Sequence, residues 1–158
     1  MRQTKRLVTL LAVILIAACT DNGIFNPLND ASGTYTLTVY AGRSIPATYV
    51  IQPNDPNYPN YPNGATLVVT GGTLVLNSNG NFVETNNYSI TPAGGGTATP
   101  TSFVSSGTWT LNGSTFTLSD PQRSRFVSGT LTVDANFHTV NYQEDNGNGG
   151  FDSFEYKM

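Results

Sequence analysis

Few side chains in this 158-residue sequence could do acid–base or nucleophilic chemistry. His138 is the only histidine, so any serine mechanism would have to use it as the base. No Gly-x-Ser-x-Gly turn, the motif that exposes a nucleophilic serine, occurs in the chain. Glu84, Glu144 and Glu155 could act in pairs, as in glycoside hydrolysis, but each is the only glutamate in its predicted strand. We therefore expect a protein that is not an enzyme.

Oxygen ligands for a metal are most concentrated in residues 144–152. Calcium loops need alternating oxygen donors and usually a bidentate acid at the end. Gly147 and Gly149 stand at alternate positions after Asp145, so the EF-hand pattern fails. Asparagine and glycine are also what a hairpin connection requires. We expect a hairpin here and neither a metal nor a cofactor, with a calcium loop as the alternative.

Cys19 is the only cysteine, which excludes an internal disulfide. It ends an apolar run that begins at Leu7 and follows three basic residues (Arg2, Lys5 and Arg6). The run is too short to span a bilayer comfortably, and small residues stand just before the cysteine, so the segment has the form of a secretory signal. No other apolar stretch is long enough to cross a membrane.

The end of this signal, Ile16-Ala17-Ala18-Cys19, resembles the lipobox of bacterial lipoproteins. In that family the cysteine sulfur carries diacylglycerol, the chain is cut before the cysteine, and the new amino terminus is acylated. The resemblance implies a signal peptide at residues 1–18, lipid attachment at Cys19, and a location in the bacterial cell envelope. Thr20 rather than aspartate follows the cysteine, and the enterobacterial sorting rule then favours the outer membrane. A plain signal peptide or an uncleaved anchor is the alternative.

Removal of residues 1–18 makes the chain acidic. The sequence has 7 Lys and Arg against 10 Asp and Glu; the signal takes three cations and no acid, which leaves four against ten and a net charge of −6. The four remaining cations are too few and too scattered to follow a phosphate backbone, so we expect no nucleic-acid partner. They are Arg43, Arg123, Arg125 and Lys157. The sequence leaves the oligomeric state open.

Residues 19–31 are predicted to be the lipid anchor and a flexible tether. They contain Asn-Gly and Asn-Pro turn signals and little to bury. We expect them to hold the folded part away from the membrane. Residues 32–158 then suit a single domain with one core.

The domain begins with a strand pattern. Tyr35, Leu37 and Val39 share one face of residues 34–39 while threonines occupy the other face, which is typical of a half-buried strand. The Gly-Thr-apolar motif at the start of this strand recurs three times in the chain. The intervals are too unequal for a solenoid, whose units stack at a fixed period. Its glycines are Gly33, Gly72, Gly107 and Gly129. We interpret the motif as a recurring strand sequence, in which glycine permits a bend or bulge.

Short turn signals connect the predicted strands. Residues 77–80 and 112–113 each stand between two alternating apolar stretches, where a hairpin needs residues that tolerate positive φ. Residues 134–136 and 145–150 separate the last strands in the same way. The sequence thus predicts eight or nine strands in chain order and no convincing helix after Cys19.

A meander of about eight strands must bury one face and hide two edges, and closure into an antiparallel up-and-down β-barrel achieves both. Gly33-Thr34-Tyr35 at its start resembles the Gly-x-Trp motif of the lipocalins, which are calycin-type barrels. The resemblance implies an all-β, lipocalin-like barrel with the Tyr35 ring closing one end, and Lys157 is the nearest candidate for the family's late arginine. A β-sandwich is the alternative. The predicted inner face comprises Tyr35, Leu37, Val39, Leu74, Leu76, Phe82, Trp109, Leu111, Phe116 and Leu118.

Residues 52–64 interrupt the meander with four prolines, which excludes a central strand. Tyr58 and Tyr61 in this loop could form an aromatic lip for a ligand at the mouth of a barrel, or they could simply cover the loop's own backbone. The candidate ligand-binding residues are these two tyrosines together with Tyr35 and Trp109 inside the barrel.

Two functions follow from the barrel. Because many large side chains face inward, we expect a filled core and a structural or interaction role with an envelope protein as partner. The alternative is a binding module for a small apolar ligand, neutral or cationic, since the negative net charge disfavours anions. The size of the internal cavity distinguishes the two.

Overall fold

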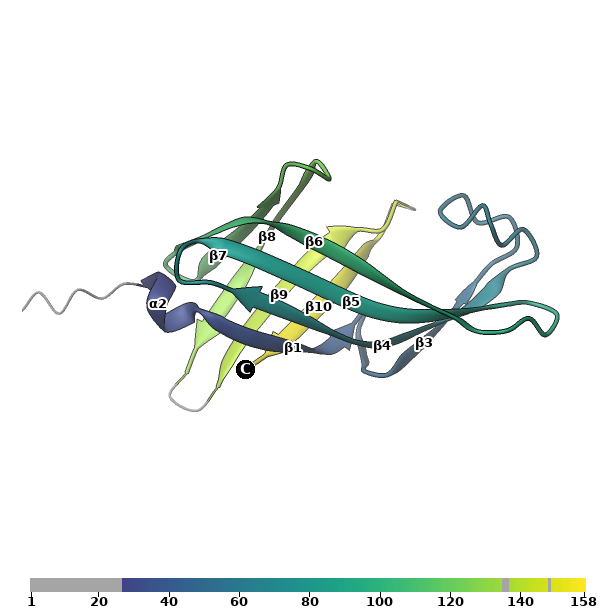
Figure 1. Ribbon diagram of the computed structural model, residues 1–158, viewed down its shortest axis with the longest axis horizontal. Helices are drawn as coiled ribbons and strands as arrows, with labels where there is room; N and C mark the ends of the chain where they lie inside the picture. The colour runs from purple at the N-terminus through teal and green to yellow at the C-terminus, as the bar shows by residue number, and fades with distance from the viewer. Residues whose placement is uncertain (1–26, 135–136, 148) are drawn as a thin grey trace, which may run out of the picture.

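The computed structural model describes residues 27–134, 137–147 and 149–158. Apart from one short helix, α2 (Pro27–Ala31), the described elements are strands (Figure 1). The strands are β1 (Gly33–Tyr40), β2 (Arg43–Ser44), β3 (Ala47–Ile51), β4 (Ala65–Leu76), β5 (Asn81–Pro92), β6 (Thr99–Asn112), β7 (Thr115–Asp120), β8 (Arg125–Val133), β9 (His138–Asp145) and β10 (Phe151–Lys157). No helix within these residues is both long and apolar enough to cross a membrane.

Eight strands close into an antiparallel up-and-down barrel. Each strand from β4 to β10 pairs with the next, β10 pairs with β1, and β1 pairs back to β4. The predicted barrel is therefore confirmed, and the sandwich alternative is excluded. Residues 52–64, as predicted, form turns rather than a strand.

On the edge away from β5, the two halves of β4 pair with different strands. Its second half pairs with β1, with Gly33 opposite Leu76, and its first half pairs with β3, with Ala47 opposite Val69. β3 therefore extends the sheet beyond the closed ring, at the end of the barrel opposite α2 (Figure 1). We call that end the mouth and the end beside α2 the closed end.

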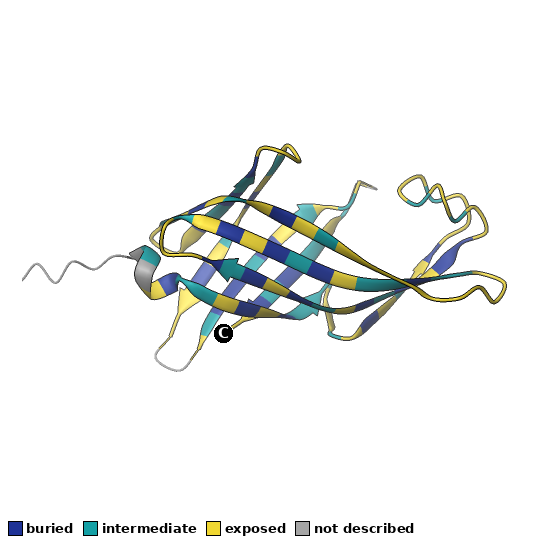
Figure 2. Ribbon diagram, in the orientation of Figure 1, coloured by how far each residue is buried: buried dark blue, intermediate teal, exposed yellow. Residues whose placement is uncertain are grey.

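Buried and exposed residues alternate along the strands, as Figure 2 shows. Eight of the ten side chains predicted to face inward are buried; only Val39 and Leu111 are intermediate. Trp109 is 1% exposed, and its indole N–H donates to the carbonyl of Asn77, 2.8 Å away in the β4–β5 turn. Large apolar side chains therefore fill the barrel near its closed end.

The predicted tether is wrong at its last five residues. Residues 27–31 form α2, Ala31 is fully buried, and Leu28 packs against the core. The Tyr35 hydroxyl donates to the Ala31 carbonyl at 2.6 Å, which fixes the helix to the first barrel strand. The helix forms because the end of an apolar barrel core needs a cover. Cys19 and the predicted signal lie outside the described residues.

A bulge in β1 overturns the predicted direction of Val39. The register of β1 on β10 shifts between Leu37 and Val39, so one extra residue enters the strand. Beyond the shift the inward position belongs to Tyr40, which lines the cavity described below, and Val39 is only half-buried. Alternation read from the sequence cannot locate such a shift.

The repeated glycines lie where the chain approaches itself closely. A Cβ at Gly107 would lie 2.0 Å from the Ser119 carbonyl oxygen, and one at Gly129 would lie 2.1 Å from that of Asn141. A Cβ at Gly72 would lie 2.3 Å from Asn86 Oδ1, next to a second bulge in β4. The repeat is thus a feature of the strands, and three of its four glycines stand where a Cβ would clash with a neighbouring strand.

Candidate functional site

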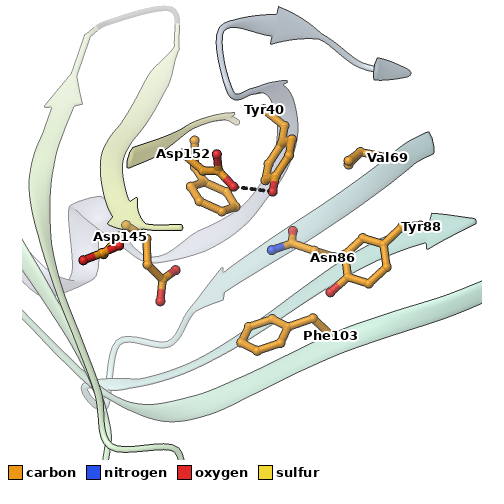
Figure 3. A pocket seen from close by; sticks show the side chains of 9 residues that line it. Tyr40, Val69, Asn86, Tyr88, Phe103, Asp145 and Asp152 are labelled. Carbon is orange, nitrogen blue, oxygen red and sulfur yellow. Dashed lines mark hydrogen bonds between the residues drawn. The ribbon is translucent and has the colours of Figure 1, made fainter. Parts of the chain in front are cut away.

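A cavity of about 210 Å³ lies inside the mouth. Figure 3 shows that the side chains around it converge from strands far apart in sequence. They are Tyr40 from β1, Val69 from β4, Asn86 and Tyr88 from β5, Phe103 from β6, Glu144 and Asp145 from β9, and Asp152 and Phe154 from β10. We call this cavity the mouth pocket.

Aromatic rings form much of its wall. Tyr40 and Phe154 meet edge to face with centroids 5.1 Å apart, and Phe154 in turn stacks on Tyr142 at 4.6 Å. Tyr88 and Phe103, on the neighbouring strands β5 and β6, lie across the pocket from Tyr40 (Figure 3). Packed rings of this kind make a preformed apolar surface.

Beneath the pocket lies a buried polar cluster around Glu84, which is fully buried. Its Oε1 accepts hydrogen bonds from the Tyr142 hydroxyl, from the Tyr156 hydroxyl at 2.7 Å and from Asn86 Nδ2 at 2.9 Å. Its Oε2 accepts from Arg125 at 2.6 Å. Four donors thus satisfy a carboxylate that would otherwise be too costly to bury.

Arg125 holds two carboxylates at once. Its guanidinium donates to both oxygens of Glu144, at 2.7 and 2.8 Å, as well as to Glu84. It also donates to Ser105 Oγ at 3.1 Å and to the Tyr142 hydroxyl at 3.2 Å. Although burial acts against its charge, the hydrogen bond to Glu144 and the charge of Glu84 raise the pKa of Arg125.

Arg125 also connects β8 and β9 where the two strands have separated. These strands pair from Val133 opposite His138 to Gly129 opposite Tyr142, and the pairing does not continue to Arg125 and Glu144. A hollow of about 630 Å³ lies between the unpaired stretches. The ion pair of Arg125 with Glu144 crosses from one strand to the other between this hollow and the mouth pocket, since Glu144 lines both.

Asp120, the last residue of β7, supports the cluster. Its Oδ2 accepts from Ser105 Oγ at 2.8 Å, and its Oδ1 accepts from the backbone N–H groups of Gln122 and Arg123 at 3.0 and 3.2 Å. Burial alone would raise the pKa of Asp120, but the Ser105 hydroxyl and three backbone N–H groups lower it below its ordinary value. Hydrogen bonds from neighbouring donors therefore stabilise the negative charge of the Asp120 carboxylate.

Two further carboxylates stand at the rim of the pocket. The Tyr40 hydroxyl donates to Asp152 Oδ2 at 2.6 Å, and the Gly147 N–H donates to Asp145 Oδ1 at 2.7 Å. Neither carboxylate forms a salt bridge with a described residue. Burial, and then the contact with Asp152, raise the pKa of Tyr40, while burial raises the pKa of Tyr88 to about 12.

The predicted ligand residues divide between the two ends of the barrel. Tyr58 lines a hollow of about 170 Å³ that adjoins the mouth pocket and shares Tyr40 and Asp152 with it. Tyr61 packs in a small apolar cluster with Ile51 and Leu67 below the loop. Tyr35 and Trp109 are core residues at the closed end and do not line the mouth pocket.

Lys157 does not act as the late arginine of the lipocalins. Its side chain is about half exposed (49%) and pairs with Glu155 at 2.9 Å, so it does not cover the Tyr35 ring. The ring beside Tyr35 is that of His138, with centroids 6.5 Å apart. His138 therefore lies away from the carboxylates of the mouth.

Sequence reasoning missed the polar cluster. Glu84 shares a strand face with buried Phe82, so alternation alone would have placed it inside. Nothing in the sequence pairs it with Arg125, which is 41 positions later. Among the described residues, no group of three or more His, Cys, Asp or Glu side chains could hold a metal ion, and this includes the acids of the 144–152 hairpin.

Comparisons with known proteins identify no relative of this chain. No family model, no curated protein and no solved structure matches the chain.

Proposed function

We propose that this protein binds a small molecule in the mouth pocket. The observation that carries the proposal is a preformed cavity of about 210 Å³ with aromatic walls and a few fixed polar groups, at the end of the barrel that its core leaves unfilled. Binding sites combine these features, because apolar surface gives affinity and a few polar groups give orientation. A cavity of about 150 Å³ holds benzene, so this one suits a ligand built on a single ring.

The polar cluster strengthens the case for binding over a purely structural role. Burying an ion pair seldom stabilises a fold more than apolar packing would. Glu84, Arg125 and Glu144 nevertheless replace such packing below the pocket. A fixed charged floor is useful when a ligand must be oriented.

The test compares two substitutions that add the same bulk. The full chain in lipid nanodiscs is titrated by calorimetry with single-ring ligands that are cationic, neutral or anionic, and empty nanodiscs are subtracted. Val69→Phe adds a ring to the pocket lining, whereas Val83→Phe adds it to a side chain on β5 that is 41% exposed. We expect saturable binding that Val69→Phe abolishes and Val83→Phe preserves. No binding by any ligand would leave the structural or interaction role.

We also propose that Cys19 carries a lipid that holds the protein in the bacterial envelope. The proposal rests on the lipobox-like residues 16–19 and on the absence of a second cysteine. Cys19→Ser should leave the precursor uncut and remove the protein from the detergent phase. Continued labelling of the serine variant by a fatty-acid probe would contradict the assignment.

A further inference from the structure

We propose that the mouth pocket selects organic ammonium ions: small molecules with a ring or short apolar body and one positive charge. This inference rests on the proposed binding function and names the class of its ligand. It follows from the juxtaposition of aromatic walls with carboxylates that no described cation neutralises.

The charges around the pocket do not balance. Arg125 is the one cation in contact with the floor, and it serves both Glu84 and Glu144, so the floor keeps one net negative charge. Asp145 and Asp152 at the rim add two more. No lysine, arginine or histidine lines the pocket itself. In a partly buried site, where water screens weakly, such an imbalance attracts a cation and repels an anion.

The neighbouring arginines are already engaged. Arg125 uses its donors on four side chains, and Arg123 pairs with Asp120 at 3.7 Å. The guanidinium groups of Arg123 and Arg125 also lie over the Phe103 ring, at 4.9 and 5.6 Å from its centroid, respectively. Neither side chain is therefore free to neutralise Asp152.

Three rings remain for a ligand: Tyr40, Tyr88 and Phe154. Both phenols are neutral at physiological pH, since the ordinary pKa of tyrosine is about 10 and burial raises the pKa of Tyr40 and Tyr88 further, so the wall offers electron-rich faces without charge of its own. A cation over such faces is attracted by the negative potential of the ring. Phe103 is excluded from this role because the arginines occupy it.

Asp152 is the natural counter-ion. It lies at the junction of the mouth pocket and the adjoining hollow, and the Tyr40 hydroxyl fixes one of its oxygens. The adjoining hollow adds the carboxylate of Asp55 and the ring of Tyr58, so it combines the same kinds of side chain. With its ammonium group near Asp152, a ligand would place its apolar body against the aromatic side chains of the pocket, whose volume suits a ligand with one ring.

A bare metal ion fits the site less well. The described residues contain no group of three or more side chains with the geometry to ligate one. The rings would also contribute nothing to a hard, strongly hydrated cation that needs oxygen ligands. The walls and the charge together therefore favour an organic cation.

The test uses three probes of nearly equal size with the full chain in lipid nanodiscs: phenethylammonium, neutral 2-phenylethanol and anionic 3-phenylpropanoate. We expect the cation to bind about tenfold more tightly than the alcohol and the anion not to bind. Asp152→Asn should weaken binding of the cation about tenfold and leave the alcohol unchanged. The substitution keeps an oxygen that can accept from Tyr40, so the fold is preserved.

Asp30→Asn is the matched control, because it removes one negative charge at the exposed surface of α2, at the closed end. It should leave all three affinities unchanged. If the alcohol binds as tightly as the cation, the ammonium inference is overturned and the binding function survives. If no probe binds, both fail. If Asp30→Asn and Asp152→Asn weaken binding of the cation equally, the effect arises from the net charge of the protein. That result would also overturn the inference.

Discussion

Arg125 is the residue on which the interior cluster depends. Its side chain is 7% exposed, and it forms ion pairs with one carboxylate that is fully buried and with another that is partly exposed. A charge left without its partner inside a protein costs several kcal/mol, which exceeds the net worth of most intact pairs. The arginine is therefore needed as soon as Glu84 is present.

Arg125→Met should destabilise the fold by about 3–5 kcal/mol, because it leaves Glu84 buried and unpaired. Adding Glu84→Gln should restore about 1 kcal/mol or more, since the unpaired charge is then removed. Urea unfolding followed by the emission of buried Trp109 measures both. Arg43→Met serves as the control, because Arg43 is exposed and should cost less than about 1 kcal/mol. Additive effects of the two cluster substitutions would contradict the proposed coupling.

Asp120 makes the stability of the protein depend on pH in the acid range. Its folded-state pKa is lowered, chiefly because the Ser105 hydroxyl and backbone N–H groups outweigh burial. The stabilisation is therefore fully present above the unfolded pKa of about 4 and is lost as the pH falls through the folded value. Asp120→Asn should differ from the parent most at pH 7 and least below pH 4, as measured by urea unfolding at each pH. A difference that stays constant with pH would contradict this account.

At the scale of strands, alternation and turn residues were enough to predict the barrel. The hairpins at residues 77–80 and 112–113 form where the sequence places them. The facing of Tyr40 escaped prediction because the bulge in β1 reverses the facing of the β1 residues after Leu37. Tyr40, which lines the pocket, appeared on the outer face in a strict alternation. Bulges arise from pairing across the sheet, so a single strand's sequence does not reveal them.

Glycines inside strands offer a test of the close approach between neighbouring strands. A Cβ at Gly129 would meet Asn141 O at 2.1 Å and the Phe116 ring at 2.6 Å, whereas a Cβ at Gly71 meets nothing within 4 Å. Gly129→Ala should therefore cost about 1–3 kcal/mol or more, because the neighbour includes backbone that cannot move away. Gly71→Ala should change stability by less than about 1 kcal/mol, or increase it. Equal effects in urea unfolding would show that the strands yield more readily than the structure implies.

Across the whole molecule, the two ends of the barrel differ in their surroundings. α2 covers the closed end, and the 52–64 loop, the β5–β6 connection and the β9–β10 turn lie toward the mouth (Figure 1). The described part of the chain begins at α2, so residue 27 lies at the closed end, away from the mouth (Figure 1).

Long-range contacts explain why the site was harder to predict than the fold. Glu84 meets Tyr142 and Tyr156, which are 58 and 72 positions away, and these contacts exist only after the barrel has closed. Tyr58, by contrast, was predicted from a local feature, a proline-rich loop, and it lies beside the pocket. Local sequence thus located the region of the mouth but not its charged floor.

The buried tyrosines make the whole barrel sensitive to alkali. Burial is the largest cause that raises the pKa of seven tyrosines: Tyr35, Tyr40, Tyr49, Tyr58, Tyr88, Tyr142 and Tyr156. For Tyr35 and Tyr88 the folded pKa is about 12, against about 10 when unfolded. A group whose folded pKa is raised contributes stability that is fully present below pH 10 and is lost as the pH rises through the folded value.

We therefore expect the native protein to show little phenolate absorbance at pH 10.5 and then to unfold cooperatively as the pH approaches about 12. Phenolate absorbance and far-ultraviolet circular dichroism should change together, because ionisation of the three buried phenols, Tyr35, Tyr142 and Tyr156, requires the barrel to open. The chain unfolded in urea, titrated in parallel, should instead ionise gradually around pH 10. Ionisation of most tyrosines near pH 10 with an unchanged circular dichroism spectrum would contradict the burial that this structure assigns to the rings.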